Sequence, residues 1–330
     1  MTGQQAQGCG NTPVLNPQEG AAIIDWAAYT LPDGAEERRL WEGGPALPFQ
    51  AKPTKGRYGY ELVEQWQAVE LWTVHRNSGP HVDASGRGCA DIAQAAQHAG
   101  SWEGWPAWLA WQIERGAKFS RLDFAVDVVG GSLDVLALAD AVEAGHLRSQ
   151  WEDSSWQLIR GIGRGASNGA TLYGGSPSSD TRLVVYDKRA ERGLPSNTPP
   201  WTRIEFRARH AAAVALAAKL AKGGMKAGMS VVRHYADFRD ATGSTLEGWK
   251  VALRDAGKSK LEVGRRGGSY DSLARWIEGD VAASLAAYVE AQGGSLDALQ
   301  TLLEQGRRAQ NAKHRTLVEQ HLALRQQRFT

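Results

Sequence analysis

Alternation of apolar and polar positions predicts strands through the first two thirds of the chain. The clearest run is Arg121–Val128, in which every second side chain is apolar, as expected for a strand with one buried face. Other runs predict six more strands, which are Ile23–Tyr29, Val69–His75, His81–Ser85, Thr171–Tyr173, Arg182–Asp187 and Trp201–Arg209. Because Asn77-Ser78-Gly79-Pro80 supplies turn residues between the second and third of these, that pair predicts a hairpin.

Helical periodicity separates these strands and then continues alone towards the end of the chain. Between strands it predicts Cys89–His98, Trp102–Gly116, a helix capped by Ser132 and running to His146, and His210–Lys222. From Thr245 onward it predicts Leu246–Arg254, Ser272–Gln292 and Leu296–Arg328. Short intervals, such as that between Tyr173 and Arg182, favour hairpins over crossover helices. We therefore predict an α+β fold, mainly an antiparallel sheet flanked by helices and followed by a helical C-terminal region.

Three segments with different compositions follow from this pattern. Residues 1–20 are rich in Gln, Gly, Asn and Pro and predict a disordered N-terminal lead-in. Residues 21–244 contain the predicted sheet, and residues 245–330 form the helical C-terminal region. That region ends in a basic tail, Gln305–Thr330, with six Lys or Arg residues against one acidic residue.

Composition excludes several classes of protein. The formal charge of the 330 residues is only +2, which argues against a generally basic nucleic-acid binder but allows a local basic groove. Cys9 and Cys89 lie far apart, so a reducing cytoplasm is expected. The longest apolar-leaning stretch, His210–Lys222, is too short for a membrane span. No phosphate-binding loop, serine nucleophile elbow or paired-histidine metal motif occurs.

Two of the predicted strands place charged side chains together on one face. In Arg121–Val128, Asp123 and Asp127 lie opposite to the apolar positions. In Trp201–Arg209, Glu205 shares its face with three arginines, which are Arg203, Arg207 and Arg209. A carboxylate among guanidinium groups suits a metal ligand beside a phosphate path. A solvated, salt-bridged sheet face without chemistry explains either strand alone equally well.

A third strand carries a candidate nucleophile. Tyr186 shares a strand face with Arg182 and Lys188. A phenol with a pKa of about 10 is mostly protonated at neutral pH, so a reactive tyrosine needs a nearby cation. Lys188, or a metal on the acidic face, would favour the phenolate. The alternative is a half-buried sheet tyrosine with a hydrogen-bonded hydroxyl.

Four short segments in order carry a resemblance to a known family. They are His81-Val82-Asp83-Ala84-Ser85-Gly86-Arg87-Gly88-Cys89, Arg121-Leu122-Asp123-Phe124-Ala125-Val126-Asp127, the stretch from Thr171 through Tyr186-Asp187-Lys188 to Glu191, and Trp201-Thr202-Arg203-Ile204-Glu205. Together they resemble the Rep_trans replication initiation factors of rolling-circle plasmids and the replication initiators of filamentous phages. The resemblance extends over about residues 22–295.

The resemblance implies that residues 21–244 are a DNA-nicking domain that initiates rolling-circle replication. A tyrosine attacks a phosphodiester, which gives a 5′-phosphotyrosine and a free 3′-hydroxyl. By position, Tyr186 matches the nucleophile and Tyr173 is the alternative. Asp123 and Glu205, with Asp127 as a third residue, match acidic ligands for Mg²⁺ or Mn²⁺, which prefer oxygen ligands.

One position departs from the family pattern. The family often has an arginine two residues before this tyrosine, where the chain has Val184. Arg182 or Arg203 would then have to contact the scissile phosphate. We accordingly count Arg203 and Lys188 with Tyr186 as candidate catalytic residues.

The implied partner is DNA, at a replication origin that is single-stranded or extruded as a cruciform. Basic residues predicted to contact it are Arg182, Arg207, Arg209, Lys258, Lys260, Arg265 and Arg266. Host helicase and polymerase are further implied partners, a homodimer is compatible with this function, and no membrane is involved. Two alternatives stay open: a DNA-binding regulator of the same fold without catalysis, and a metal-dependent nuclease that uses water as nucleophile.

Overall fold

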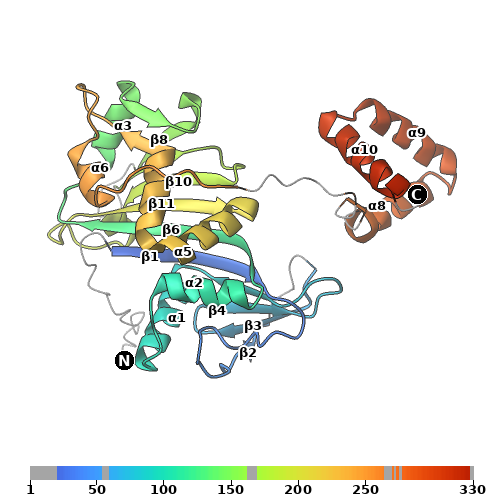
Figure 1. Cartoon of the computed structure of the whole chain (residues 1–330), viewed down its shortest axis with the longest axis horizontal. Helices are drawn as coiled ribbons and strands as arrows, with labels where there is room; N and C mark the ends of the chain where they lie inside the picture. The colour runs from blue at the N-terminus through green and yellow to red at the C-terminus, as the bar shows by residue number, and fades with distance from the viewer. Residues whose placement is uncertain are drawn as a thin grey trace, which may run out of the picture. The chain divides into compact units, whose positions relative to one another are not determined.

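The computed structural model describes residues 21–53, 59–161, 169–263, 270, 273–274 and 277–327 (Figure 1). The chain divides into two compact units, Met1–Gly264 and Arg265–Thr330. Helix α6, Glu247–Ala252, lies beyond the boundary expected at residue 245 but packs into the first unit. Its Trp249 is fully buried, and the indole Nε1 donates to the backbone oxygen of Ala236 at 3.1 Å. A buried tryptophan therefore ties this helix to the sheet domain.

The first unit is built on one large antiparallel sheet. Its ten strands lie in the order β2-β3-β4-β5-β1-β6-β11-β10-β9-β8, and β12 and β7 form a separate pair. The bounds are β1 Ala21–Thr30, β2 Gln50–Ala51, β3 Leu62–Trp66, β4 Val69–Thr73, β5 His81–Ala84, β6 Lys118–Val129, β7 Leu147–Ser149, β8 Trp156–Arg160, β9 Ala170–Gly174, β10 Thr181–Asp187, β11 Trp201–Arg209 and β12 Ala236–Phe238. The predicted fold class is confirmed, and so is the β4–β5 hairpin, in which Val69 lies opposite Ala84.

Strand β6 lies inside this sheet, and its alternation decides which face is the core. Leu122, Phe124, Val126 and Val128 are all buried, and they point to the side on which the helices pack. The helices of the first unit are α1 Gly86–His98, α2 Trp105–Glu114, α3 Val135–Glu143, α4 Lys188–Glu191, α5 His210–Tyr235 and α6. Figure 1 shows α2 and α5 lying across the sheet. At one contact Gly228 of α5 is so close to Phe124 that an added Cβ would lie 2.5 Å from the ring.

Three of these helices differ in detail from the pattern-based predictions. Asp134, not Ser132, caps α3, because its carboxylate accepts a hydrogen bond from the Leu136 nitrogen at 3.1 Å. Helix α2 begins at Trp105 rather than Trp102 and ends at Glu114, and its buried Gln112 donates to the Tyr29 hydroxyl at 3.1 Å.

Helix α5 does not end at Lys222. It continues through a kink at Gly224, whose φ of 70° lies outside the helical region. Glycine adopts this conformation without steric cost. The helix continues after the kink because Met229, Val231 and Val232 of its second half are buried in the core.

The second unit contains helices α8 Ala282–Ala291, α9 Leu296–Arg308 and α10 Ala312–Gln327. The sequence predicts the last two as one helix, and that prediction is wrong. The chain breaks between them because Asn311 caps α10, its side-chain oxygen accepting a hydrogen bond from the His314 nitrogen at 3.2 Å. In the described part of the chain, no helix combines the length and apolar character needed to cross a membrane.

Candidate active site

The charged positions of the three central strands meet on the sheet face opposite the helices. Arg203 on β11 lies between Asp127 on β6 and Tyr186 on β10. Glu205 lies opposite Val184, and Arg207 lies between Asp123 and Arg182. Directly paired residues of an antiparallel sheet point to the same side, so these side chains share one surface, here called the polar face. The structure thus brings Tyr186 together with the acidic and basic residues predicted on the other two strands.

A buried ion-pair network occupies one end of the polar face. Asp127 accepts hydrogen bonds from Arg203 Nε and Nη2, each at 2.7 Å, and from Trp201 Nε1 at 2.8 Å. Arg203 Nη1 also donates to Asp25. Burial acts to lower the pKa of Arg203, but Asp127 and Asp25 outweigh it and raise that pKa above its usual value. Arg203 is therefore held as a fixed cation, with each of its three nitrogens bonded to a carboxylate.

Asp25 is a site residue that the sequence did not predict. It lies in β1 at an irregularity between Ile24 and Trp26, where the pairing with β6 shifts register. Burial raises the pKa of Asp25, with Arg203 acting in the opposite direction. The available signal was a single carboxylate inside the apolar run Ile23–Tyr29.

Asp123 forms a second buried pair on the same strand. It is fully buried and accepts hydrogen bonds from Arg121, the shortest at 2.5 Å from Nη2. The Arg121 guanidinium in turn lies 3.7 Å from the ring centre of Trp26. Burial, reinforced by Glu205 and partly offset by Arg121, raises the pKa of Asp123 to about 7. The charge of this buried carboxylate is consequently only partly stabilised by Arg121.

The acidic residues fit a divalent cation as a pair rather than as a trio. Glu205 is buried and accepts from Arg207 Nε at 2.7 Å, and the same nitrogen lies 4.0 Å from Asp123 Oδ2. Two buried carboxylates that share one guanidinium offer hard oxygen donors of the type that Mg²⁺ and Mn²⁺ bind. Asp127 lies about 13 Å from Asp123 along the strand at roughly 3.3 Å per residue, and its oxygens are engaged by Arg203 and Trp201. The described residues form no group of three or more His, Cys, Asp or Glu able to hold a metal.

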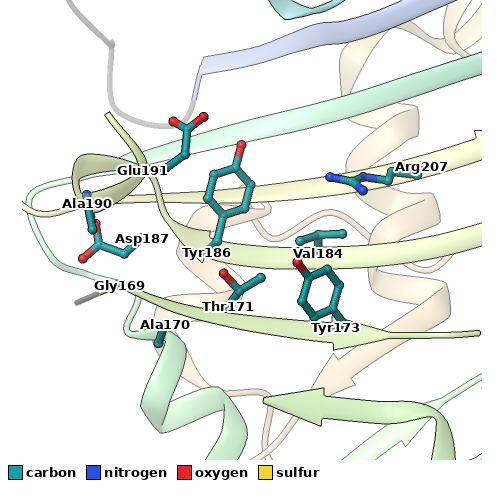
Figure 2. A pocket seen from close by; sticks show the side chains of 10 residues that line it. All are labelled: Gly169, Ala170, Thr171, Tyr173, Val184, Tyr186, Asp187, Ala190, Glu191 and Arg207. Carbon is teal, nitrogen blue, oxygen red and sulfur yellow. Dashed lines mark hydrogen bonds between the residues drawn. The ribbon is translucent and has the colours of Figure 1, made fainter. Parts of the chain in front are cut away.

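A pocket of about 490 Å³ opens beside this cluster. Figure 2 shows it bordered by both candidate nucleophiles, with Tyr186 on β10, Tyr173 on β9 and Arg207 further along. The full lining consists of Gly169, Ala170, Thr171, Tyr173, Val184, Tyr186, Asp187, Ala190, Glu191 and Arg207. Both candidate nucleophiles therefore belong to the wall of one open pocket.

Tyr186 begins a short motif whose three side chains have distinct positions. Asp187 caps α4 by accepting from the Ala190 nitrogen at 2.9 Å. This turn brings the buried Lys188 back under the tyrosine, where its Nζ donates to Tyr186 Oη at 3.3 Å and to Glu191 Oε2 at 2.9 Å. Burial, followed by the charge of Glu205, raises the pKa of Tyr186, while Arg203 opposes them. The phenol is therefore protonated in the free protein; Arg203 favours its anion electrostatically, and Lys188 is hydrogen-bonded to its oxygen.

Tyr173 has a different electrostatic environment. The Arg182 guanidinium lies 4.3 Å from the centre of its ring, and Arg207 lines the same pocket. Burial and the charge of Arg207 lower the pKa of Arg182. Arg182 Nε is buried and has no hydrogen-bond partner among the described residues. Arg182 therefore has a donor without a partner, and Arg207 adds positive charge at the pocket wall.

The remaining predicted DNA contacts lie in three places. Arg209 is at the far end of β11, where it donates to the Pro177 oxygen at 3.2 Å. Lys258 and Lys260 follow α6 and are exposed on the helix side of the sheet. Arg265 and Arg266 lie outside the described residues.

Comparison with known proteins places this geometry in context. The family model of replication initiation factors, Rep_trans, matches residues 117–303. A Bacillus subtilis (strain 168) protein named as a DNA relaxase, NicK, is 25% identical over 260 residues, covering 74% of this chain and 73% of the relative. A solved rolling-circle replication initiator from Geobacillus stearothermophilus matches with a TM-score of 0.56 and 20% identity, covering 73% of this chain and 98% of that one.

Proposed function

Because this chain belongs to the replication initiation factor family, we propose that it nicks one DNA strand at a rolling-circle origin and becomes joined to the 5′ end. The observation that carries this proposal is the position of Tyr186. Its phenol lines an open pocket on the same face as Glu205, Asp123 and Arg207. Nucleophile, acidic pair and phosphate-binding cation are the groups that a strand transfer requires.

The proposed reaction is a transesterification. Tyr186 Oη attacks the scissile phosphorus, the new bond is a phosphotyrosine ester, and the bond from phosphorus to the 3′-oxygen breaks. The phenol loses its proton and the leaving 3′-oxygen gains one, so the strand ends in a free 3′-hydroxyl. Lys188 stabilises the phenolate, since its ammonium already donates to that oxygen. The energy of the phosphodiester is kept in the ester, and the ends can be rejoined.

Arginines hold the phosphate in this proposal. Arg207 lines the pocket, Arg182 lies against the ring of Tyr173 in the pocket wall, and Arg209 extends the basic row along β11. Arg203 is a positioning residue, because its guanidinium binds Asp127 and Asp25 and so ties β11, the neighbour of the Tyr186 strand, to β6 and β1. Charge-assisted pairs of guanidinium and phosphate supply both affinity and orientation.

Asp123 and Glu205 would hold Mg²⁺ or Mn²⁺, which supplies positive charge to the non-bridging oxygens of the phosphate. We expect Glu205→Gln to lower the yield of covalent adduct in Mg²⁺ by on the order of 10²-fold, a typical cost of losing one charge-stabilising group. The measurement is adduct formation on a labelled oligonucleotide, with the exposed Glu152→Gln as matched control. Equal adduct yield in Mg²⁺ and in chelator would contradict the metal role.

Tyr173 is the second candidate nucleophile, and a specific observation favours it. It lies beside Arg182 and Arg207, whereas burial and then the charge of Glu205 raise the pKa of Tyr186, against the opposing charge of Arg203. Cations favour a phenolate and carboxylates oppose it. We keep Tyr186 as the nucleophile because it has the direct bond from Lys188 and the family position, and the two are separable by substitution.

One experiment tests the proposed function as a whole. The full chain is incubated with a single-stranded origin oligonucleotide labelled at either end, and the products are separated before and after protease treatment. A nicking initiator leaves a peptide on the 5′ end of the downstream fragment. A hydrolytic nuclease leaves a nick without peptide, and a non-catalytic DNA-binding regulator leaves the strand intact. The free 3′-hydroxyl would serve a host polymerase, and unwinding would need a host helicase.

A further inference from the structure

A second basic surface lies on the opposite side of the sheet from the pocket. It consists of Lys219 and Lys226 on α5 together with Lys258 and Lys260 from the segment after α6, here called the α5 basic surface. Lys219 Nζ donates to the Lys260 backbone oxygen at 2.9 Å, and the Ser259 nitrogen donates to Ser230 of α5 at 3.0 Å. These contacts pack the segment that carries Lys258 and Lys260 against α5, so its lysines lie near those of the helix.

The position of α5 separates this surface from the active site. Leu216, Leu220 and Val232 are fully buried in the core that covers the apolar face of the sheet. Lys226 and Lys260 are exposed, and Ser230, one turn after Lys226, contacts the lysine-bearing segment. The lysines thus lie on the outside of the helical layer, while Tyr186 lies beyond the sheet.

The positive charge of this surface is only partly balanced. Asp237 is fully buried and holds Lys258 at 2.9 Å and Arg239 at 2.8 Å. Among the described residues, Lys219, Lys226 and Lys260 form no ion pair. His234 lies among the lysines, and its pKa is lowered by burial and then by the charges of Lys258, Lys260 and Lys219. The positive electrostatic potential of this surface therefore disfavours protonation of His234 and favours binding of an anion.

The chemistry of the surface points to a nucleic-acid backbone rather than to exposed bases. Lysine is a compact point charge that binds phosphate without reading bases. Single-stranded DNA is usually bound through aromatic side chains on which bases stack. Such rings border the pocket, but the nearby Tyr235 is turned inward against Phe206, with ring centres 4.9 Å apart.

We propose that the α5 basic surface binds the phosphate backbone of duplex DNA adjoining the nicked strand. This inference rests on the proposed function. The surface adds affinity for origin DNA without taking part in the chemistry. Because the two surfaces lie on opposite sides of the sheet, DNA that contacts both passes around the sheet edge. Backbone contacts of this kind are independent of sequence and strongly dependent on salt.

The test is a triple variant, Lys219→Gln, Lys226→Gln and Lys260→Gln, in the full chain. Lys258 is retained because it compensates the buried Asp237. The variant should form the covalent adduct on a short single-stranded oligonucleotide within twofold of the wild-type rate. Its affinity for the same site flanked by duplex should fall by tenfold or more at low salt. The slope of log affinity against log salt should decrease by up to about 3, near 0.9 per lost phosphate contact.

A matched control removes three exposed cations elsewhere, Arg76→Gln, Lys118→Gln and Arg160→Gln. The proposal is overturned if the triple variant keeps wild-type duplex affinity and salt slope, or if the control loses as much. It is also overturned if the variant loses single-strand nicking in parallel. Absence of any adduct with the wild-type protein would instead contradict the proposed function, and the duplex-binding measurement distinguishes the two failures.

Discussion

Replacing Tyr186 with phenylalanine is expected to reduce the covalent protein–DNA adduct by on the order of 10⁴-fold or more, the size of loss seen when an enzyme nucleophile is removed. The substitution deletes only the attacking oxygen. Phenylalanine keeps the ring on β10, and the buried Lys188 retains its ion pair with Glu191 at 2.9 Å. Binding of single-stranded origin DNA should therefore be preserved, as measured by fluorescence anisotropy beside adduct yield.

The reciprocal variant Tyr173→Phe decides between the two phenols. If Tyr186 is the nucleophile, Tyr173→Phe should retain the adduct, because only the hydroxyl is lost and the ring that Arg182 contacts is kept. Tyr288→Phe, in the second unit and 42% exposed, serves as a neutral control. A normal adduct with Tyr186→Phe and none with Tyr173→Phe would transfer the role to Tyr173. Mass mapping of the peptide that remains on DNA identifies the residue directly.

Replacing Arg203 with methionine is expected to destabilise the first unit by about 3–5 kcal/mol, the cost of breaking a buried ion pair by removing one partner. Methionine fills the space of the aliphatic stem but leaves the carboxylates of Asp127 and Asp25 without their cation. Arg203 is only 4% exposed, so water cannot replace the lost hydrogen bonds. Urea unfolding followed by tryptophan fluorescence measures the difference.

The stability lost in the Arg203→Met variant should increase as the pH rises. Burial raises the pKa of Asp25 and Arg203 opposes that rise, so without Arg203 the pKa of Asp25 in the folded state lies further above its unfolded value and the folded state binds more protons. Stability then falls as pH rises through that interval, and the deficit of the variant should be larger at pH 8 than at pH 5. Adding Asp127→Asn to the variant removes one uncompensated charge and should recover part of the loss.

A surface pair provides the control for this prediction. Arg38 donates to both oxygens of Glu64 at 2.7 Å, as Arg203 does to Asp127, but its side chain is 37% exposed. Arg38→Met should therefore cost less than about 1 kcal/mol, as exposed ion pairs do. A loss of this small size with Arg203→Met would show that the network does not hold the central strands together.

Local patterns predicted the long central strands well and the peripheral elements poorly. Strands β6, β10 and β11 alternate over seven or more residues, so one face identifies itself as buried. Strands β2, β7 and β12 have two or three residues, too few for a period to be visible. They form because a neighbouring strand supplies hydrogen-bond partners. Likewise, α5 continues past Gly224 because burial of Met229 and Val232 in the core stabilises its second half. This burial outweighs the local break in helical geometry at Gly224.

The sequence by itself determined the faces of the central strands, the α+β class and, through four ordered motifs, the family. These properties follow from side-chain periodicity and motif order, which are local or linear in the chain. Only the tertiary structure decided which strands are neighbours and in what register, because pairing depends on hydrogen bonds between distant segments. That register set Arg203 between Asp127 and Tyr186, recruited Asp25 from a bulge in β1, and placed Arg207 beside both Asp123 and Glu205. The chemistry of the polar face is thus a property of strand order, whereas its composition was already present in the sequence.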